Sequence, residues 1–253
     1  MKVAIEQGGS EVGLRAARII LGERDLTALG LIGKDPSGTD DRVEQVTDLA
    51  HYDVVMTDAA DAAGLVEAAL DAGISCVVWA DGVELEASFG EQFAEAGTVL
   101  LTGANVASGL TPSLAAHETA VGGEVMEVSI AWTEPGTPLR RGEPIPFPDP
   151  IGPRWAAERQ TDEGYTAYAA PVTGDWAGAF ARVTSAEPEG VVMRIVGVAD
   201  HAAHLEALSL AAAVLAVDMY APGAHRPADA AEIYLAKALD AGLGVASYVM
   251  AKE

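Results

Sequence analysis

Cysteine is almost absent from this chain of 253 residues, which contains only Cys76. A single cysteine excludes an intramolecular disulfide and a metal site built from several thiolates. Cys76 lies in an apolar run, 74–79, and is expected to be a small buried hydrophobe. No run of eighteen apolar residues occurs, and the first residues do not have the pattern of a signal peptide. We therefore expect no membrane span and a cytoplasmic protein.

Basic residues are also few, because 15 lysines and arginines stand against 38 acidic residues and give a net charge of −23. Such a charge repels phosphate backbones, so nucleic acid is not an expected partner. An anionic cofactor remains compatible if backbone N–H groups and a few local cations bind it. Half of the residues are hydrophobic, which is enough for one large domain or two small ones.

The first 122 residues alternate between short apolar segments and longer helical patterns. Expected strands cover residues 2–6, 26–32, 53–56, 74–79 and 98–101. Expected helices cover residues 12–21, 60–72 and 84–96, the last two stopped by Gly73 and Gly97. Short strands that alternate with helices predict right-handed βαβ crossovers and a parallel sheet. We expect a Rossmann-type dinucleotide-binding domain over residues 1–122.

The pattern changes after Gly122 and Gly123. Expected strands cover 124–133, 166–172, 177–184 and 190–198, a proline-rich stretch covers 135–153, and expected helices cover 201–217 and 228–241. These elements predict a smaller α+β domain over 123–253 with an open, mostly antiparallel sheet. The last helix is expected to be able to return and pack on the first domain. The fold class is thus α/β, with this second domain following the parallel sheet.

The first turn carries a variant of the dinucleotide-binding motif. Gly8, Ser10 and Gly13 stand at the spacing of G-x-G-x-x-G, with serine in the middle position, and Gly9 adds backbone freedom. A strand precedes the turn and a helix follows it, which is the context that the motif requires. Expected cofactor contacts in the turn are made by Gly8, Gly9, Ser10, Glu11, Val12 and Gly13. The alternative is an ordinary βα turn without a ligand.

Lys34 follows the second expected strand, at the position that normally contacts the ribose of the adenosine. A cation there favours the 2′-phosphate of NADP over NAD. A solvated charge at the end of a strand is the competing interpretation.

The ends of the third, fourth and fifth expected strands carry small and polar residues. The carboxyl ends of parallel strands line the ligand crevice in a doubly wound sheet. We expect cofactor contacts from Thr57, Asp58, Ala59, Asp81 and Gly103, with Asn105 near the nicotinamide or the substrate as a candidate catalytic residue. His117, on the helix after the fifth strand, is a candidate proton donor. Turns favour the same residue types, and a core or surface role for His117 remains the alternative.

The loop at 102–113, TGANVASGLTPS, completes a resemblance. The strand–glycine turn–helix start, the length and the Gly-Leu-Thr-Pro ending of this loop look like the two-domain dehydrogenases of dihydrodipicolinate reductase and its saccharopine and diaminopimelate dehydrogenase relatives. The paired-histidine motif of the reductases is absent, as is any lysine between Lys34 and Lys237. The catalytic residues of the family are therefore not carried over. The resemblance implies a cofactor-binding fold and hydride transfer.

Four of the eleven arginines fall within twenty residues near the proline-rich stretch: Arg140, Arg141, Arg154 and Arg159. Arginine binds carboxylates in a bidentate manner, so this group is the candidate substrate-binding site. The alternative is a solvated loop that neutralises Asp149 and Glu158. His201 and His204 are three residues apart at a helix start, but no third ligand is evident and no metal is expected.

These observations predict an NAD(P)-dependent oxidoreductase that acts on a small carboxylate-bearing substrate of the amino-, imino- or keto-acid type. One rival is a dinucleotide-sensing or interaction protein that has kept the fold and lost the chemistry. Another is a Rossmann-like domain that binds a different nucleotide. A homodimer or homotetramer built through the second sheet is expected, because the few helices cannot cover all of its apolar strands.

Overall fold

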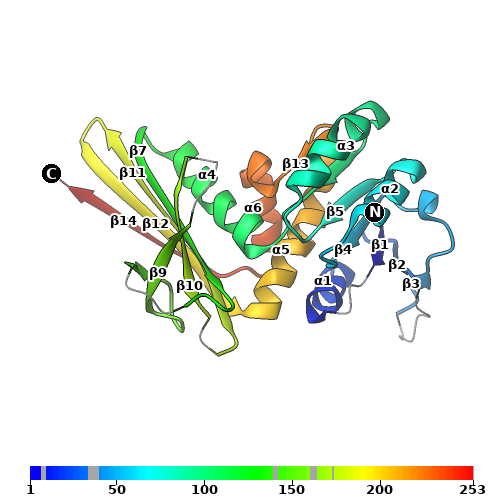
Figure 1. Cartoon of the computed structure of the whole chain (residues 1–253), viewed down its shortest axis with the longest axis horizontal. Helices are drawn as coiled ribbons and strands as arrows, with labels where there is room; N and C mark the ends of the chain where they lie inside the picture. The colour runs from blue at the N-terminus through cyan, green and yellow to red at the C-terminus, as the bar shows by residue number, and fades with distance from the viewer. Residues whose placement is uncertain (7–9, 34–39, 139–141, 160–163, 173, 253) are drawn as a thin grey trace.

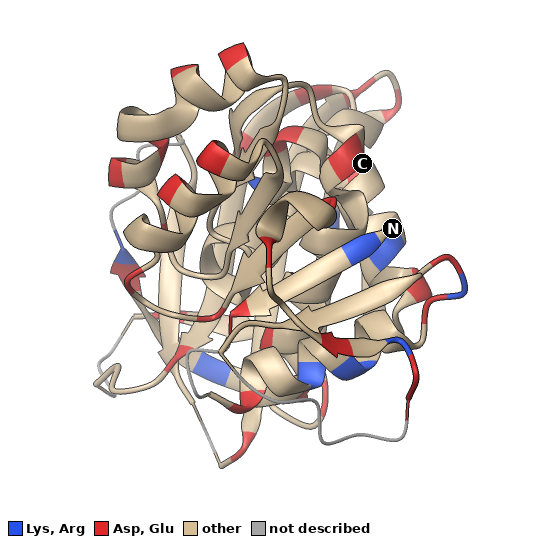
Figure 2. Ribbon diagram, turned by 90° about the vertical axis from the view of Figure 1, so that its right-hand side faces the viewer, with Lys and Arg blue, Asp and Glu red and all other residues tan. Residues whose placement is uncertain are grey.

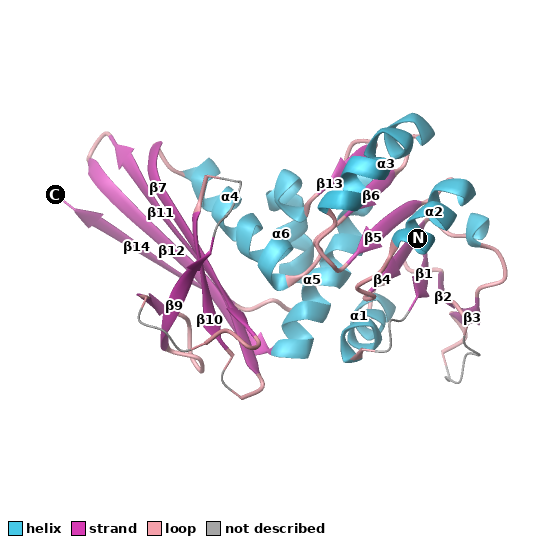
Figure 3. Ribbon diagram, viewed as in Figure 1, coloured by secondary structure: helices cyan, strands magenta, loops and turns pink. Residues whose placement is uncertain are grey.

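Two sheets stand at opposite ends of the molecule with helices between them (Figure 1, Figure 3). The computed structural model describes residues 1–6, 10–33, 40–138, 142–159, 164–172 and 174–252. The helices between the sheets are α4 (Thr111–Val121), α5 (Ala202–Ala216) and α6 (Ala231–Asp240).

The first sheet has seven strands in the order β13-β6-β5-β4-β1-β2-β3, and every pairing is parallel. Its strands are β1 (Lys2–Glu6), β2 (Ala28–Leu31), β3 (Val43–Gln45), β4 (Val54–Thr57), β5 (Ser75–Val78), β6 (Val99–Leu101) and β13 (Gly223–His225). The strand order reverses between β1 and β4. In an open parallel sheet this switch point opens the ligand crevice at the carboxyl ends of the strands.

Helices cover both faces of this sheet. Helix α1 (Glu11–Leu21) packs against α5 on the side that faces the rest of the molecule. Helices α2 (Ala63–Ala72) and α3 (Val83–Ala96) pack on the other side, in a separate apolar cluster that includes Cys76. Both end at a glycine in the left-handed conformation, Gly73 and Gly97, as the sequence predicts. Cys76 is fully buried, and its burial raises the pKa of the thiol.

The second sheet has the strand order β14-β12-β11-β7-β10-β9-β8. Its strands are β7 (Glu124–Glu134), β8 (Glu143–Pro146), β9 (Pro153–Arg159), β10 (Thr166–Pro171), β11 (Trp176–Glu187), β12 (Gly190–His201) and β14 (Val245–Lys252). All pairings are antiparallel except that between β7 and β10. The predicted class, a Rossmann-type parallel sheet followed by an open and mostly antiparallel one, is confirmed.

Helix α5 forms the centre of the core. Its sequence is apolar on all sides, with alanine and leucine almost throughout, and such a helix is stable only when protein surrounds it. One apolar cluster runs from β1 and α1 through α5 to the inner face of the second sheet. The segment Ala202–Met219 is long and apolar enough to cross a membrane, but it is mostly buried here as a core helix.

The structure adds strands that the sequence analysis did not predict. Strands β3 and β13 have three residues each, β8 and β9 lie in or beside the proline-rich stretch, and β14 closes the chain. Strand β13 returns to the first sheet and pairs with β6. The boundary near residue 122 therefore remains a prediction, since residues on both sides of it belong to the first sheet.

Candidate functional site

The turn that begins α1 is hydrogen-bonded to a carboxylate that follows a neighbouring strand, β4. Ser10 is the N-cap of α1, and its Oγ accepts the N–H of Val12 at 3.1 Å. The Ser10 hydroxyl donates a short hydrogen bond to Oδ2 of Asp58, and the same oxygen accepts the N–H of Gly13 at 3.0 Å. Gly8 and Gly9 lie outside the described residues.

The pairing of β1 with β4 explains why Asp58 reaches this turn. Glu6 stands opposite Thr57 in the parallel register, so the residue after β4 lies beside the start of α1. The Thr57 hydroxyl donates to a Glu6 carboxylate oxygen at 3.3 Å and accepts the N–H of Ala59 at 3.0 Å. A Cβ on Gly13 would lie 2.8 Å from Oδ2 of Asp58, so only glycine leaves room for the carboxylate. The structure thus brings together the residues predicted from the turn and from the end of β4.

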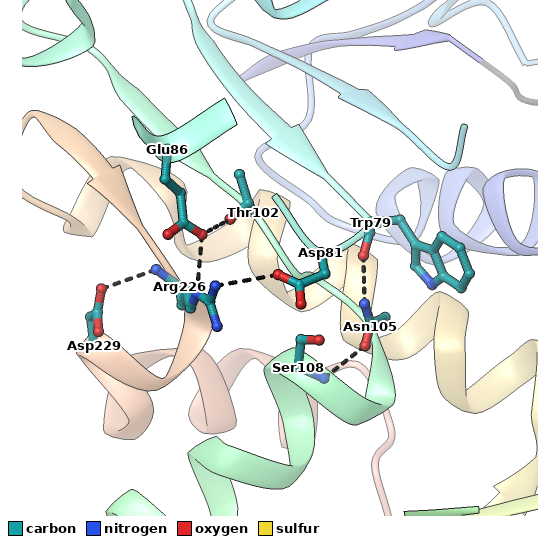
Figure 4. A network of polar contacts seen from close by, with 8 residues as sticks. All are labelled: Trp79, Asp81, Glu86, Thr102, Asn105, Ser108, Arg226 and Asp229. Atoms are coloured by element: carbon teal, nitrogen blue, oxygen red, sulfur yellow. Dashed lines mark hydrogen bonds and ion pairs between the residues drawn. The ribbon is translucent and has the colours of Figure 1, made fainter. Parts of the chain in front are cut away.

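Asn105 joins the loops that follow β5 and β6 (Figure 4). Its Nδ2 donates to the carbonyl of Trp79 at 2.8 Å, and its Oδ1 accepts the N–H of Ser108 at 2.8 Å. The second bond caps a π-helical turn, η2 (Val106–Leu110), that leads into α4. Gly103, at φ +66°, donates its N–H to Ala80 at 2.9 Å. Asn105 therefore positions these loops, and its predicted catalytic role remains a prediction.

Glu206 of α5 reaches the same loops and was not predicted from the sequence. Its Oε2 accepts the indole N–H of Trp79 at 2.8 Å and the backbone N–H of Val106 at 3.0 Å. Burial raises the pKa of the Glu206 carboxyl, and the two hydrogen bonds oppose that shift. The available signal was one acidic residue inside an otherwise apolar helix. Glu206 ties the central helix to the carboxyl ends of β5 and β6.

Asp81 belongs to a polar network around Arg226, which Figure 4 shows. Nη2 of Arg226 lies 3.3 Å from an Asp81 oxygen, and Nε lies 3.0 Å from Oε1 of Glu86. The same Glu86 oxygen accepts a short hydrogen bond from the Thr102 hydroxyl, and the N–H of Arg226 donates to Asp229 at 3.0 Å. Asp81 also lines a hollow of about 400 Å³ with residues 60–63 and 82–85.

Two further hollows lie near the ends of the turn. One, of about 310 Å³, lies between the ends of β1 and β2, the segment after β3 and α2. Its lining is mixed: apolar side chains such as Ile32 and Leu65 stand beside the carboxylates Glu6 and Asp48. The other, of about 480 Å³, lies between α1 and the start of α5; its lining includes Glu11, Arg15, Asp175 and His201. Arg15 is bonded to Glu11 at 2.6 Å, and the His201 ring stacks on Trp176 with centroids 4.3 Å apart. Residues from both halves of the chain therefore enclose the second hollow.

His117 lies elsewhere. It is exposed on α4 and lines a different hollow, of about 540 Å³, with Asp229 and Ile233. Nothing in these contacts connects it to the turn, so its role as a proton donor remains a prediction. His204 lies 3.8 Å from Asp200, and the described part of the chain contains no group of three or more side chains that could hold a metal ion.

Of the four predicted substrate-binding arginines, two can be placed. Arg154 and Arg159 lie on strand β9 rather than in a loop. Nη1 of Arg154 donates to the carbonyl of Pro153 at 2.9 Å. Nη2 of Arg159 lies 2.8 Å from Oε2 of Glu134, and this hydrogen bond lowers the pKa of the Glu134 carboxyl. Arg140, Arg141 and also Lys34 lie outside the described residues.

Comparison with known proteins was informative for the fold alone. No protein-family model and no curated protein matches the chain. The structure is similar to that of a saccharopine dehydrogenase (L-Glu forming) from Saccharomyces cerevisiae, with a TM-score of 0.70 and 10% identity over 99% of this chain and 100% of that chain.

Two other solved structures are similar over most of their length. One is an engineered D-amino acid dehydrogenase bound to NADP+, with a TM-score of 0.56 and 17% identity over 92% of this chain and 95% of that chain. The other is a dihydrodipicolinate reductase from Paenisporosarcina, with a TM-score of 0.54 and 12% identity over 89% of this chain and 97% of that chain. The resemblance predicted from the sequence is confirmed for the fold, which is that of the two-domain dehydrogenases.

Proposed function

We propose that this chain is an NAD(P)-dependent oxidoreductase that transfers a hydride to or from a small carboxylate-bearing substrate of the amino-, imino- or keto-acid type. One observation carries the proposal. The hollow of about 480 Å³ between α1 and α5 lies beside the first turn of the Rossmann-type sheet, and both halves of the chain line it. In open parallel sheets this is the edge at which ligands bind.

Different parts of the structure support the proposed positions of the two ends of a dinucleotide. The hollow of about 310 Å³ offers an adenine ring apolar side chains at the carboxyl ends of β1 and β2. The nicotinamide, which supplies or accepts the hydride, would belong near the loops after β5 and β6, where Asn105 and Glu206 hold the backbone in place. In the described part of the turn a pyrophosphate would compete with Asp58, which already accepts the N–H of Gly13.

The substrate is proposed to bind between the second sheet and these loops. His201 lines the hollow of about 480 Å³, and its ring stacks on Trp176. The arginines near β9 are the proposed carboxylate ligands, since a guanidinium binds a carboxylate with two parallel hydrogen bonds. To bind a substrate carboxylate, Arg159 must divide its guanidinium donors between the substrate and Glu134, with which it now forms an ion pair. The similar enzymes named above act, by their names, on amino acids or related compounds.

A non-catalytic, dinucleotide-sensing protein is the second candidate. Two observations favour it: both polar atoms of the Asn105 side chain are bonded to backbone, and His117 lies on a different hollow. A chain with these features could bind a cofactor without moving a proton to or from a substrate.

Titration with NADPH and NADH, followed by nicotinamide fluorescence, separates the candidates. The oxidoreductase is expected to bind NADPH with a Kd in the micromolar to millimolar range, about −8 to −4 kcal/mol, and to turn over a member of a panel of keto, imino and amino acids. Absence of binding near 1 mM would refute both candidates. Binding without turnover of any panel member would favour the sensor.

Lys34 provides the matched variant for cofactor choice. Lys34→Ala is expected to weaken NADPH binding about tenfold through loss of a charge-assisted bond to the 2′-phosphate. NADH binding should not change, because NAD has no phosphate at that position. Equal effects on both cofactors would show that Lys34 does not read the ribose.

The chain is proposed to form a homodimer or homotetramer through the second sheet. Its edge strand, β14, exposes Val245, Tyr248, Val249 and Met250. A long apolar edge strand is a surface that proteins normally cover.

A further inference from the structure

The first turn of α1 already holds an anion, and that anion belongs to the chain. Asp58 is only 7% exposed as a residue, and its Oδ2 accepts the Gly13 N–H and the Ser10 hydroxyl. We call these two donors the phosphate seat. Backbone N–H groups at a helix N-terminus, aided by the helix dipole, are the donors that bind a cofactor phosphate. Asp58 therefore occupies two donors at this helix N-terminus for which an incoming phosphate would compete.

The fold builds this contact in at three points. The parallel register of β1 and β4 places Asp58 beside the turn. Gly13 leaves the space, since a Cβ there would lie 2.9 Å from Cγ of Asp58 as well as against its oxygen. Ser10 binds in two directions, because its Oγ accepts from Val12 while its hydroxyl donates to Asp58. The motif residues thus accommodate a carboxylate in the place of a ligand.

The surrounding charges add to the effect of Asp58. Glu11 lies in the first turn of α1, and the nearby cation, Arg15, is bonded to it at 2.6 Å. Glu6 ends the strand that leads to the turn and accepts from Thr57. A phosphate that approaches the seat meets these carboxylates too, but among the described carboxylates it is Asp58 that bonds to the donors of the seat.

We propose that Asp58 is a built-in competitor for the phosphate seat and sets the affinity of the chain for the phosphate part of its ligand. A pyrophosphate binds on α1 only when the Asp58 side chain leaves Gly13 and Ser10. The identity of the ligand as a dinucleotide rests on the proposed function. The occupation of the seat by Asp58 does not.

The test uses inorganic pyrophosphate as the probe, with NADPH in parallel, and measures both affinities by isothermal titration calorimetry. Asp58→Ala empties the seat and should bind pyrophosphate about tenfold more tightly than the wild type, equivalent to about 1.4 kcal/mol. Asp58→Asn keeps an acceptor oxygen for Gly13 and Ser10 but removes the charge, so its gain should be smaller. It also replaces the alanine variant if the latter fails to fold, as judged by circular dichroism.

Asp61→Asn is the matched control. Asp61 is exposed on the same loop, three residues from Asp58, and its Oδ1 accepts from Ala63 rather than from α1. This variant removes an equal charge and leaves the seat occupied, so its affinity for pyrophosphate should stay close to that of the wild type. A gain equal to that of the Asp58 variants would assign the effect to net charge and overturn the proposal.

The outcomes for the two probes can be told apart. Tighter pyrophosphate binding by the Asp58 variants supports the competitor, and if NADPH then binds none of the proteins, the cofactor proposal fails alone. If NADPH binds the wild type, and folded Asp58 variants bind neither probe more tightly, the competitor fails while the cofactor proposal stands. Weaker pyrophosphate binding by the Asp58 variants would also overturn the competitor, since it would make Asp58 part of the binding site.

Discussion

Glu206 shows how one side chain can connect parts of the chain that are far apart in sequence. Its carboxylate accepts from Trp79, 127 residues away, and from Val106, 100 residues away. Both donors lie in loops at the carboxyl edge of the first sheet, while Glu206 itself lies on the central helix. If the carboxylate were removed, two N–H groups in a largely apolar environment would lose their acceptor.

Two substitutions at Glu206 should separate packing from charge. Glu206→Ala is expected to lower the free energy of unfolding by about 2–4 kcal/mol, because two donors lose their only acceptor in this contact. Glu206→Gln keeps an acceptor oxygen for both donors and should be at least as stable as the wild type at neutral pH. Urea unfolding of both variants gives the comparison.

The direction of the pH dependence follows from the raised pKa of Glu206. A carboxyl whose pKa is raised by folding favours the neutral form in the folded state. Its contribution is full below the ordinary value of 4.5 and is lost as the pH rises through the raised pKa. The stability advantage of Glu206→Gln should therefore grow as the pH rises above 4.5 and disappear below it. An advantage that does not change with pH would show that folding does not shift this group.

At the scale of whole elements, strand β13 connects distant parts of the chain, because it belongs to the second half of the chain but pairs within the first sheet. It has three residues and, among the described strands, pairs with β6 alone. The residue that follows it, Arg226, bonds to Glu86 at the start of α3 and to Asp81 after β5. We interpret this ion-pair network as the interaction that holds β13 against the first sheet.

Arg226→Met keeps an unbranched apolar stem and removes the charged guanidinium. The Arg226 and Glu86 side chains are each 25% exposed, so their pair is better shielded than a surface pair. Its loss should cost about 1–2 kcal/mol in unfolding free energy. It should also increase hydrogen exchange in β13, and the cost should shrink in high salt.

Arg15→Met is the control for this prediction. The Arg15 and Glu11 side chains are 38% and 63% exposed on one helix, so the loss of their pair should cost about 0.5 kcal/mol or less. Equal costs for the two variants would show that the Arg226 network contributes no more than a surface ion pair.

The elements of the first sheet could be predicted from the sequence because their signals are local. Apolar segments such as the strand at Lys2–Glu6, and stops such as Gly73 and Gly97, are read within a few residues. Strand β13 could not be predicted in this way, since Gly-Ala-His has no pattern and its partner lies more than 120 residues earlier. Strand β14 carries two valines and a tyrosine, residue types that favour strands, but small residues interrupt them and they form no clear alternation.

The residues of the candidate site also divide into those that the sequence could predict and those that it could not. The motif in the first turn pointed to Ser10 and Gly13, and the carboxyl end of the third expected strand pointed to Asp58. Hydrogen bonds join the three residues, and their roles in cofactor binding stay predictions. That Asp58 would turn its carboxylate onto α1 depends on a register and a rotamer that spacing does not specify. Glu206 and Arg226 were missed because their partners are 100 or more residues away in the chain.

At the scale of the whole molecule, an apolar core lies beneath an acidic surface. The core runs through α5 and joins the two sheets, which gives the two halves a shared interior. Acidic residues far outnumber basic ones on the helices and loops of the face shown in Figure 2. Like charges at this density oppose association between copies of the chain. A contact between copies therefore requires a surface that is apolar and lies apart from these charges.

Strand β14 provides such a surface. It forms one edge of the second sheet, and Tyr248 and Val249 are 61% and 64% exposed. Its partner strand, β12, covers one side only, so the outer backbone groups of β14 are open to pairing. A second copy could extend the sheet there across a twofold axis, which buries the same strand from each chain.

Val249→Asp tests this arrangement by placing a charge in the expected contact. Sedimentation equilibrium of the wild type should show a dimer or tetramer. The variant should raise the Kd of self-association at least about tenfold, because a desolvated carboxylate in an apolar contact costs more than about 1.4 kcal/mol. Val83→Asp is the matched control, because Val83 is 59% exposed at the first residue of α3, where an acid suits the helix. A monomeric wild type, or equal dissociation by both variants, would contradict association through β14.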